Sequence, residues 1–186
     1  MSEFRKEILI GVTAGIAAYK TCDLVSRLVK SGYGVSVIMT ENATNLVGPR
    51  TFQALTGRPV LTRIFSATES AIPHIEPARR ADLFCIAPAT ANFLAKASCG
   101  LADDLLSTLY LAYHGPVLLA PAMNCEMWAK PAVQRNYCQL QEDGVHFVGP
   151  ESGHLACGVN GIGRMSEPEK IFERIQEILT ENTQSK

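Results

Sequence analysis

The chain has 186 residues, with 17 Lys plus Arg against 18 Asp plus Glu, and its formal net charge at pH 7 is −1. This length suits one globular domain with its own apolar core, and a charge near zero favours neither nucleic acid nor an anionic membrane as a partner. No apolar run reaches the roughly 20 residues of a membrane span, and no signal-peptide pattern opens the chain. We therefore expect one cytoplasmic domain over residues 1–186, with a small molecule as its partner.

The cysteines give no pattern typical of a metal site or a disulfide framework. Their spacing contains no C-x-x-C pair and no Cys/His arrangement that would close a tetrahedral zinc site. We expect no bound metal, and most of these thiols are expected to be buried or incidental in a reducing compartment. The set is Cys22, Cys85, Cys99, Cys125, Cys138 and Cys157.

Short apolar runs bounded by turn residues recur along the chain and predict strands. Nearly continuous apolar runs suit a parallel sheet that is covered on both faces. The runs are Ile8 to Val12, Val35 to Met39, Leu83 to Ala87, Val117 to Ala120 and Val145 to Val148. Helical stretches separate them, clearest from Ile16 to Lys30, where apolar residues recur at helical spacing. The alternation predicts an α/β fold, a doubly wound, Rossmann-like or flavodoxin-like parallel sheet with helices on both faces. Its ligand is expected at the carboxyl ends of the strands.

Two segments near the C-terminus differ in character. A last helix is predicted from Ser166, as N-cap, with Glu169 three residues on and an apolar face of Ile171, Ile175, Ile178 and Leu179. The preceding stretch, Gly149 to Met165, has five glycines and is predicted to be neither strand nor helix. A glycine-rich stretch of this length inside a domain is typical of a functional lid or of a disordered segment.

Small and polar residues follow the first three predicted strands, at the same edge of the sheet. They lie in Gly11 to Ile16, Thr40 to Asn42 and Pro88 to Asn92. Backbone N–H groups at helix N-termini bind phosphate, and small residues allow its approach. The first loop also fits an ordinary tight turn, and Thr40 and Thr90 also fit helix N-caps. Together the loops favour a shared mononucleotide site.

Three residues are candidates for chemistry. His74 has an intrinsic pKa near neutrality and can move a proton, although a single histidine is more often a structural surface or core residue than a catalyst. Asn124 lies in an apolar corner, Pro121 to Trp128, that follows a predicted strand, where a side-chain amide needs polar partners. Cys157 lies inside the glycine-rich stretch, where a thiol on a lid can exchange a proton with a ligand.

These segments resemble a known family in both sequence and order. Pro121 to Trp128 matches the P-x-M-N-x-x-M-W motif of the homo-oligomeric flavin-containing cysteine decarboxylases, and the resemblance runs from about residue 7 to 180. The supporting segments are His74-Ile75, Pro88 to Asn92, Gly100 to Leu106, Leu155 to Gly158 and Gly163 to Met165. The A-C-G…G-x-M element is similar to that of the phosphopantothenoylcysteine decarboxylases of coenzyme A biosynthesis, and differs from the peptide cysteine decarboxylases.

The resemblance implies a role for each matched position. His74 becomes the active-site base, Asn124 the group that holds the substrate carboxylate, and Cys157 the proton donor. His154, Ala156 and Met165 line the flap side of the substrate site. Flavin mononucleotide (FMN) lies against Ala14, Gly15, Ile16, Thr40, Asn42, Thr90, Ala91, Asn92, Phe93 and Ala122. Phe93 replaces a Thr that is common in the family, so a backbone contact is expected there, and Val159 replaces an Asp that commonly follows the A-C-G triplet.

The implied activity is that of a carboxy-lyase: FMN-dependent conversion of 4'-phosphopantothenoylcysteine to 4'-phosphopantetheine. Oxidation of the thiol to a thioaldehyde gives the electron sink for loss of carbon dioxide, and the enethiol is then reduced. The family implies homotrimers, or dodecamers built of trimers, and a phosphopantothenate–cysteine ligase as a separate partner. Two alternatives stay open: an oxidative decarboxylase of a C-terminal peptide cysteine, and a flavin-binding regulatory subunit without turnover.

Overall fold

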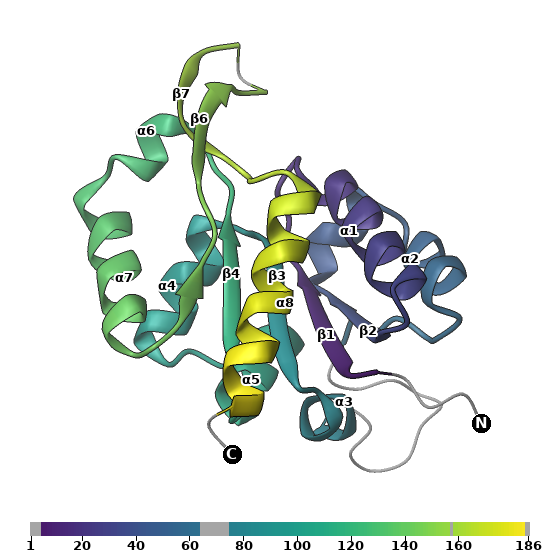
Figure 1. Cartoon of the computed structure of the whole chain (residues 1–186). Coiled ribbons are helices and arrows are strands. Elements are labelled where there is room, and N and C mark those ends of the chain that lie inside the picture. Colours follow the sequence, from purple (N-terminus) through teal and green to yellow (C-terminus); the bar gives the residue numbers. More distant parts are fainter. Residues whose placement is uncertain (1–4, 64–74, 157, 185–186) are drawn as a thin grey trace.

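A computed structural model describes residues 5–63, 75–156 and 158–184. His74 and Cys157 lie outside the described residues. The main sheet has five parallel strands in the order β2-β1-β3-β4-β5 (Figure 1). Its strands are β1 (Glu7–Val12), β2 (Gly34–Met39), β3 (Leu83–Ala89), β4 (Val117–Pro121) and β5 (His146–Phe147). The expected doubly wound parallel sheet is confirmed.

Burial on both faces explains why the strands are almost wholly apolar. On β1, Ile8 and Ile10 belong to one buried cluster while Leu9 belongs to the other, because successive side chains point to opposite faces. The first cluster is completed by α1 (Ala18–Lys30), α2 (Pro49–Thr56) and α8 (Pro168–Gln184). The second is completed by α3 (Ile75–Arg80), α4 (Ala91–Cys99), α5 (Leu105–Ala112) and α7 (Pro131–Glu142). None of the helices within the described ranges is both long and apolar enough to traverse a bilayer.

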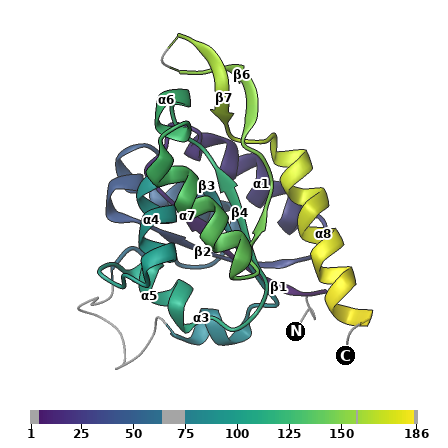
Figure 2. The same ribbon diagram turned by 90° about the vertical axis from the view of Figure 1, so that its left-hand side faces the viewer.

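The glycine-rich stretch forms a β-hairpin, so the prediction that it contains no regular structure is wrong. Strands β6 (Glu151–His154) and β7 (Asn160–Arg164) pair antiparallel, and two views show the hairpin rising beyond the carboxyl edge of the main sheet (Figures 1 and 2). The backbone ladder needs no side chains, and glycine is placed where space is short. A Cβ on Gly161 would lie 2.7 Å from the Cβ of Cys125. Close packing, which sequence periodicity does not reveal, therefore explains glycine in a strand.

The last helix begins at Pro168 and not at Ser166. Proline has no N–H and a fixed φ suited to a first helical turn, and the carbonyl of Glu167 accepts from the N–H of Ile171 at 3.2 Å. Ser166 is therefore buried ahead of the helix and is not its cap. The expected apolar face of α8 is confirmed, since Ile171, Ile175, Ile178 and Leu179 are all buried.

Helix α1 also begins slightly later than predicted, at Ala18 instead of Ile16. Its buried side includes Ala18, Leu24, Val25 and Leu28. The residues before Ala18 form a turn, which leaves the first βα connection open at the carboxyl edge of the sheet.

Candidate functional site

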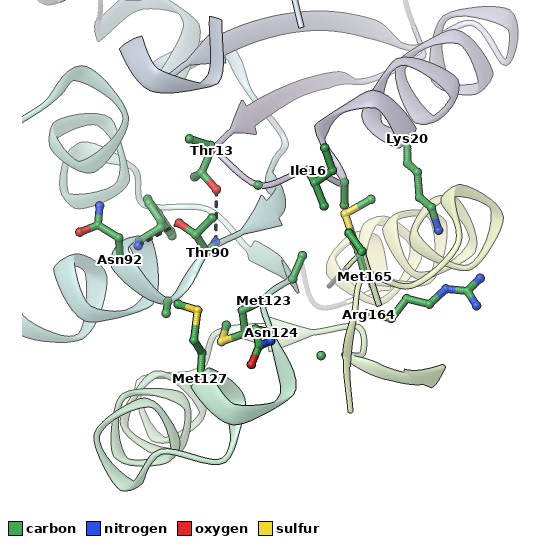
Figure 3. A pocket seen from close by; sticks show the side chains of 18 of the residues that line it. Thr13, Ile16, Lys20, Thr90, Asn92, Met123, Asn124, Met127, Arg164 and Met165 are labelled. Atoms are coloured by element: carbon green, nitrogen blue, oxygen red, sulfur yellow. Dashed lines mark hydrogen bonds between the residues drawn. The ribbon is translucent and has the colours of Figure 1, made fainter. Parts of the chain in front are cut away.

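A cavity of about 1250 Å³ lies at the carboxyl edge of the sheet, beside the hairpin (Figure 3). The loops after β1, β2, β3 and β4 form its walls together with β6, β7, Leu155 and Ala156. Every described residue that the family resemblance singled out lines this cavity. They are Ala14, Gly15, Ile16, Thr40, Asn42, Thr90, Ala91, Asn92, Phe93, Ala122, Asn124, His154, Ala156 and Met165. Their individual roles stay predictions.

Thr13, which the sequence did not single out, fastens two of these loops together. Its buried Oγ1 donates to the carbonyl of Pro88 at 2.7 Å. The same oxygen accepts from the N–H of Thr90 at 3.2 Å (Figure 3). A hydroxyl can do both because it carries one donor and two acceptor lone pairs. Thr21, one turn into α1, similarly donates to the carbonyl of Ala87 at 2.7 Å. The start of α1 is thereby held against the end of β3.

The turn between β1 and α1 packs closely against the end of β3 on one side and faces the cavity on the other. A Cβ on Gly15 would lie 3.3 Å from the Cγ of Pro88, so a larger residue would press on β3. Ile16 follows with 63% of its surface exposed, although it is a large apolar residue at the wall of a cavity. An exposed isoleucine beside a close backbone turn suits contact with a flat, partly apolar ligand.

The threonines expected as possible N-caps differ. Thr90 caps α4, since its Oγ1 accepts from the N–H of Phe93 at 3.4 Å. Thr40 precedes the 3₁₀ helix Glu41–Asn45 without a side-chain cap, and its Oγ1 is buried with no hydrogen-bond partner among the described residues. A buried hydroxyl without a partner costs roughly 1–3 kcal/mol. The hydroxyl of Thr40 therefore fits a polar group of a ligand in the cavity.

The loop after β4 is tied to both the sheet and the hairpin. The N–H of Ala122 donates to the carbonyl of Ala89 at 3.0 Å, and the N–H of Met123 donates to the carbonyl of Gly163 at 2.9 Å. The Oδ1 of Asn124 accepts from the N–H of Glu126 at 2.7 Å, at the start of α6 (Cys125–Trp128). This bond orients the side-chain amide of Asn124 at the cavity wall, where Figure 3 shows it beside Met123.

A partly buried charge network supports the wall on the side of α4. The Nζ of Lys96 lies 2.6 Å from the Oδ1 of Asp103 and 2.7 Å from the Oδ2 of Asp104. Asp104 also caps α5 by accepting from the N–H of Ser107 at 2.8 Å. Burial opposes ionisation of Asp104, but the bonds from Lys96 and Ser107 outweigh it, so the pKa of Asp104 lies below its ordinary value.

A second charge cluster, also missed by the sequence analysis, lies where the hairpin meets α1. The Nζ of Lys20 is 2.8 Å from the Oε1 of Glu167, and Arg164 bonds the same oxygen. The bond from Lys20, followed by that from Arg164, holds the pKa of Glu167 below its ordinary value. Arg164 and Glu167 are three residues apart, but Lys20 is 147 residues from Glu167, so no spacing in the sequence could have added Lys20 to the pair. Within the described ranges, no group of three or more His, Cys, Asp or Glu residues is arranged to hold a metal ion.

Comparison with known proteins supports the resemblance drawn from the motifs. The Flavoprotein family matches residues 2–180. The coenzyme A biosynthesis bifunctional protein CoaBC of Bacillus subtilis (strain 168) is 48% identical over 179 residues, which cover 96% of this chain and 44% of that protein. The chain thus spans less than half the length of this curated relative.

Solved structures give a similar result. The FMN-dependent cysteine decarboxylase SpaF is 34% identical with a TM-score of 0.81, over 95% of this chain and 97% of that chain. A PPC decarboxylase mutant complexed with pantothenoylaminoethenethiol is 28% identical with a TM-score of 0.81, over 92% of this chain and 96% of that chain. From the family match and these similarities, the chain belongs to the Flavoprotein family.

Proposed function

We propose that the chain is an FMN-dependent decarboxylase that converts 4'-phosphopantothenoylcysteine to 4'-phosphopantetheine in coenzyme A biosynthesis. The main support is that the described residues matched to the family motifs, which come from five separate segments, line a single cavity. The similarity to a bifunctional protein of coenzyme A biosynthesis and to a PPC decarboxylase points to the same substrate.

The cavity fits FMN on the side of the first three loops. Thr40 offers a buried hydroxyl that lacks a partner, and Gly15 and Ile16 offer a close backbone turn followed by an exposed apolar surface. Thr13 and Thr90 keep the loops after β1 and β3 at a fixed separation. FMN, when bound, supplies a hydride acceptor and donor, chemistry that no amino-acid side chain provides.

The chain's own residues would orient the substrate and move protons. Asn124, held by Glu126 N–H, would hold the substrate carboxylate, with His154, Ala156 and Met165 along the hairpin side. An amide can donate to a carboxylate through its NH₂ while its oxygen stays bonded to the backbone. His74 as base and Cys157 as proton donor are proposals from the motif match alone.

The test is incubation of the purified, FMN-loaded protein with 4'-phosphopantothenoylcysteine. Release of carbon dioxide together with formation of 4'-phosphopantetheine is the expected result. An Asn124→Ala variant should keep FMN, measured by its absorbance, but lose most of the turnover. Absence of carbon dioxide release from a fully FMN-loaded wild-type protein would refute the proposal.

One alternative is favoured by a specific similarity. SpaF, an FMN-dependent cysteine decarboxylase, has the same TM-score as the PPC decarboxylase and a higher identity. A peptide ending in cysteine is therefore the competing substrate in the same assay. Turnover of that peptide without turnover of phosphopantothenoylcysteine would assign the chain to peptide modification. A loaded protein inert to both would fit a regulatory flavin-binding subunit.

Assembly and partners belong to the same proposal. We propose homotrimers, or dodecamers built of trimers, in the cytoplasm, which light scattering of the purified protein would test. A phosphopantothenate–cysteine ligase is the proposed functional partner, because the Bacillus relative is bifunctional and this chain spans only 44% of it.

A further inference from the structure

Lys20 and Arg164 form the one place on the described cavity wall where cations outnumber carboxylates. The described Lys and Arg residues that line the cavity are Lys20, Lys96 and Arg164. Lys96 is bonded to two carboxylates, those of Asp103 and Asp104, whereas Lys20 and Arg164 share a single carboxylate oxygen of Glu167. The Lys96 end therefore has an excess of negative charge, and the Lys20 end has an excess of positive charge.

The excess of positive charge belongs to the residues that line the cavity. Glu151, which pairs with Arg164 across the hairpin, acts electrostatically on it, but Glu151 is itself bonded to Lys170 at 2.9 Å. Lys170 also interacts with Glu173, so the extended cluster is balanced, but Glu151, Lys170 and Glu173 do not line the cavity. The wall itself therefore presents two cations, Lys20 and Arg164, against the one carboxylate of Glu167.

Both cations keep donors available for a further acceptor. An ammonium has three N–H donors and a guanidinium has five, and Glu167 Oε1 takes one from each. Only 15% of the Lys20 side chain is exposed, so its charge acts in a partly desolvated setting where attraction to an anion is stronger than in water. Arg164, 38% exposed, presents a planar group suited to paired bonds with a phosphate.

The position of this cluster suits the far end of an elongated substrate. Figure 3 shows Lys20 and Arg164 apart from Thr90 and Asn92, with Ile16 and Met165 on the cluster's side of the pocket. Asn124, the proposed holder of the carboxylate, projects from a different wall, at the start of α6. A conjugate with a carboxylate at one end and a phosphate at the other needs two polar ends separated by a less polar surface.

We infer that Lys20 and Arg164 bind the terminal phosphate of the substrate and so select phosphorylated conjugates over their unphosphorylated counterparts. This inference rests on the proposed function for the identity of the conjugate. A phosphate monoester has a charge near −2 at neutral pH, and charge-assisted hydrogen bonds to it are about twice as strong as neutral ones. Glu167 holds the two side chains together and limits the net charge when no anion is bound.

The experiment compares phosphopantothenoylcysteine with pantothenoylcysteine, using carbon dioxide release for kcat/KM and equilibrium dialysis for Kd. Lys20→Met and Arg164→Met should each lower kcat/KM and weaken binding for the phosphorylated conjugate by about 10- to 100-fold, the usual range for a lost charged hydrogen bond. Both values for the unphosphorylated conjugate should change by less than about threefold. Lys20→Arg should restore much of the preference, and Glu167→Gln should strengthen it.

Arg27→Met is the matched control, because Arg27 is an exposed cation on α1 that bonds Asp23 and does not line the cavity. It should leave the preference for the phosphorylated conjugate unchanged. Equal losses on both conjugates in the Lys20 and Arg164 variants, or a wild-type protein without preference, would overturn the inference. Loss of FMN affinity with an unchanged preference would also overturn it and would assign the cations to the cofactor phosphate.

The two proposals fail in different ways. If the wild-type protein releases no carbon dioxide from either conjugate, the proposed function fails. Dialysis still tests the inference in that case, because tighter binding of the phosphorylated conjugate that Lys20→Met abolishes would support the phosphate site without turnover. Thermal unfolding of each variant identifies any that has lost its fold, and Lys20→Gln or Arg164→Gln, which also removes the charge, then replaces it in the comparison.

Discussion

The hydroxyl of Thr13 links the loop after β1 to the loop after β3, since it donates to the carbonyl of Pro88 at 2.7 Å and accepts from the N–H of Thr90 at 3.2 Å. Because parallel strands β1 and β3 are neighbours in the sheet, one buried hydroxyl fixes the separation of two cavity walls. The proposed FMN site therefore depends on the two hydrogen bonds of Thr13 as well as on the residues that would contact the ligand.

Replacement of Thr13 by valine should weaken both the fold and FMN binding. Valine has nearly the same shape but leaves the carbonyl of Pro88 and the N–H of Thr90 without this partner, which we expect to lower the free energy of unfolding by about 1–3 kcal/mol. Thr21→Val is the matched control, since Thr21 makes a similar buried bond to Ala87 but does not line the cavity. Urea unfolding should show losses in both variants, and FMN titration should show weaker binding only in Thr13→Val. Equal FMN affinity in the two variants would contradict this role of Thr13.

Thr40→Val should have the opposite effect on stability. Its hydroxyl is buried and has no partner among the described residues, so its removal should leave the FMN-free protein equally or more stable. The same change should raise the Kd of FMN by about tenfold, which corresponds to roughly 1.4 kcal/mol. Fluorescence titration of FMN measures the affinity, and Thr40→Ser, which keeps the hydroxyl, should bind nearly as the wild type does. A Thr40→Val protein with unchanged FMN affinity would show that this hydroxyl is not a cofactor contact.

Gly163→Ala should loosen the hairpin from the loop after β4. Gly163 has φ +152°, and a Cβ there would press against the carbonyl oxygen of Met123. The bond from Met123 N–H to Gly163 O would then be strained or broken, so the melting temperature should fall and proteolysis of the hairpin should accelerate. Gly48→Ala is the control, because Gly48 has φ −67° and no heavy atom within 4 Å of an added Cβ. Equal melting temperatures for the two variants would contradict the proposed steric contact.

The Lys96–Asp104 pair should contribute stability that disappears in acid. The folded-state pKa of Asp104 is lowered, because Lys96 and Ser107 outweigh the effect of burial. A carboxyl with a lowered folded pKa stabilises the fold above its unfolded pKa of about 3.9 and loses that contribution as pH falls through the folded value. Asp104→Asn keeps a residue suited to an N-cap but removes the charge, so the stability difference between wild type and variant should shrink from pH 6 to about pH 2. Urea unfolding at several pH values measures this difference. A difference independent of pH would refute the assignment.

The sheet and its order of loops could be predicted from the sequence because their cause is local. A strand buried on both faces, such as Leu83–Ala89, must be apolar throughout, and its run of letters shows that directly. The same holds for the apolar face of α8, where helical spacing places Ile171 and Ile175 on one side. The residues of the cavity were found through motif order, because the loops after parallel strands meet at one edge.

Several features depended on contacts that the sequence does not encode locally. The β6–β7 hairpin was missed because its glycines are explained by neighbours such as Cys125, which comes from another part of the chain. Helix α8 begins at Pro168 and not at the predicted Ser166, because proline suits the first turn of a helix. Ser166 is buried ahead of the helix. Lys20, Arg164 and Glu167 look like ordinary solvated charges until the fold brings α1 to the base of the hairpin.

The sequence by itself therefore determined the fold class, the edge of the sheet at which the ligand site lies and the family, because strand burial and motif order are properties of short segments. Only the tertiary structure decided which hydroxyl is bonded within the protein, as in Thr90, and which is left for a ligand, as in Thr40. It also decided where positive charge exceeds negative charge on the cavity wall. Hydrogen bonds and local net charge depend on contacts between residues that are far apart in the chain, and only the folded structure determines those contacts.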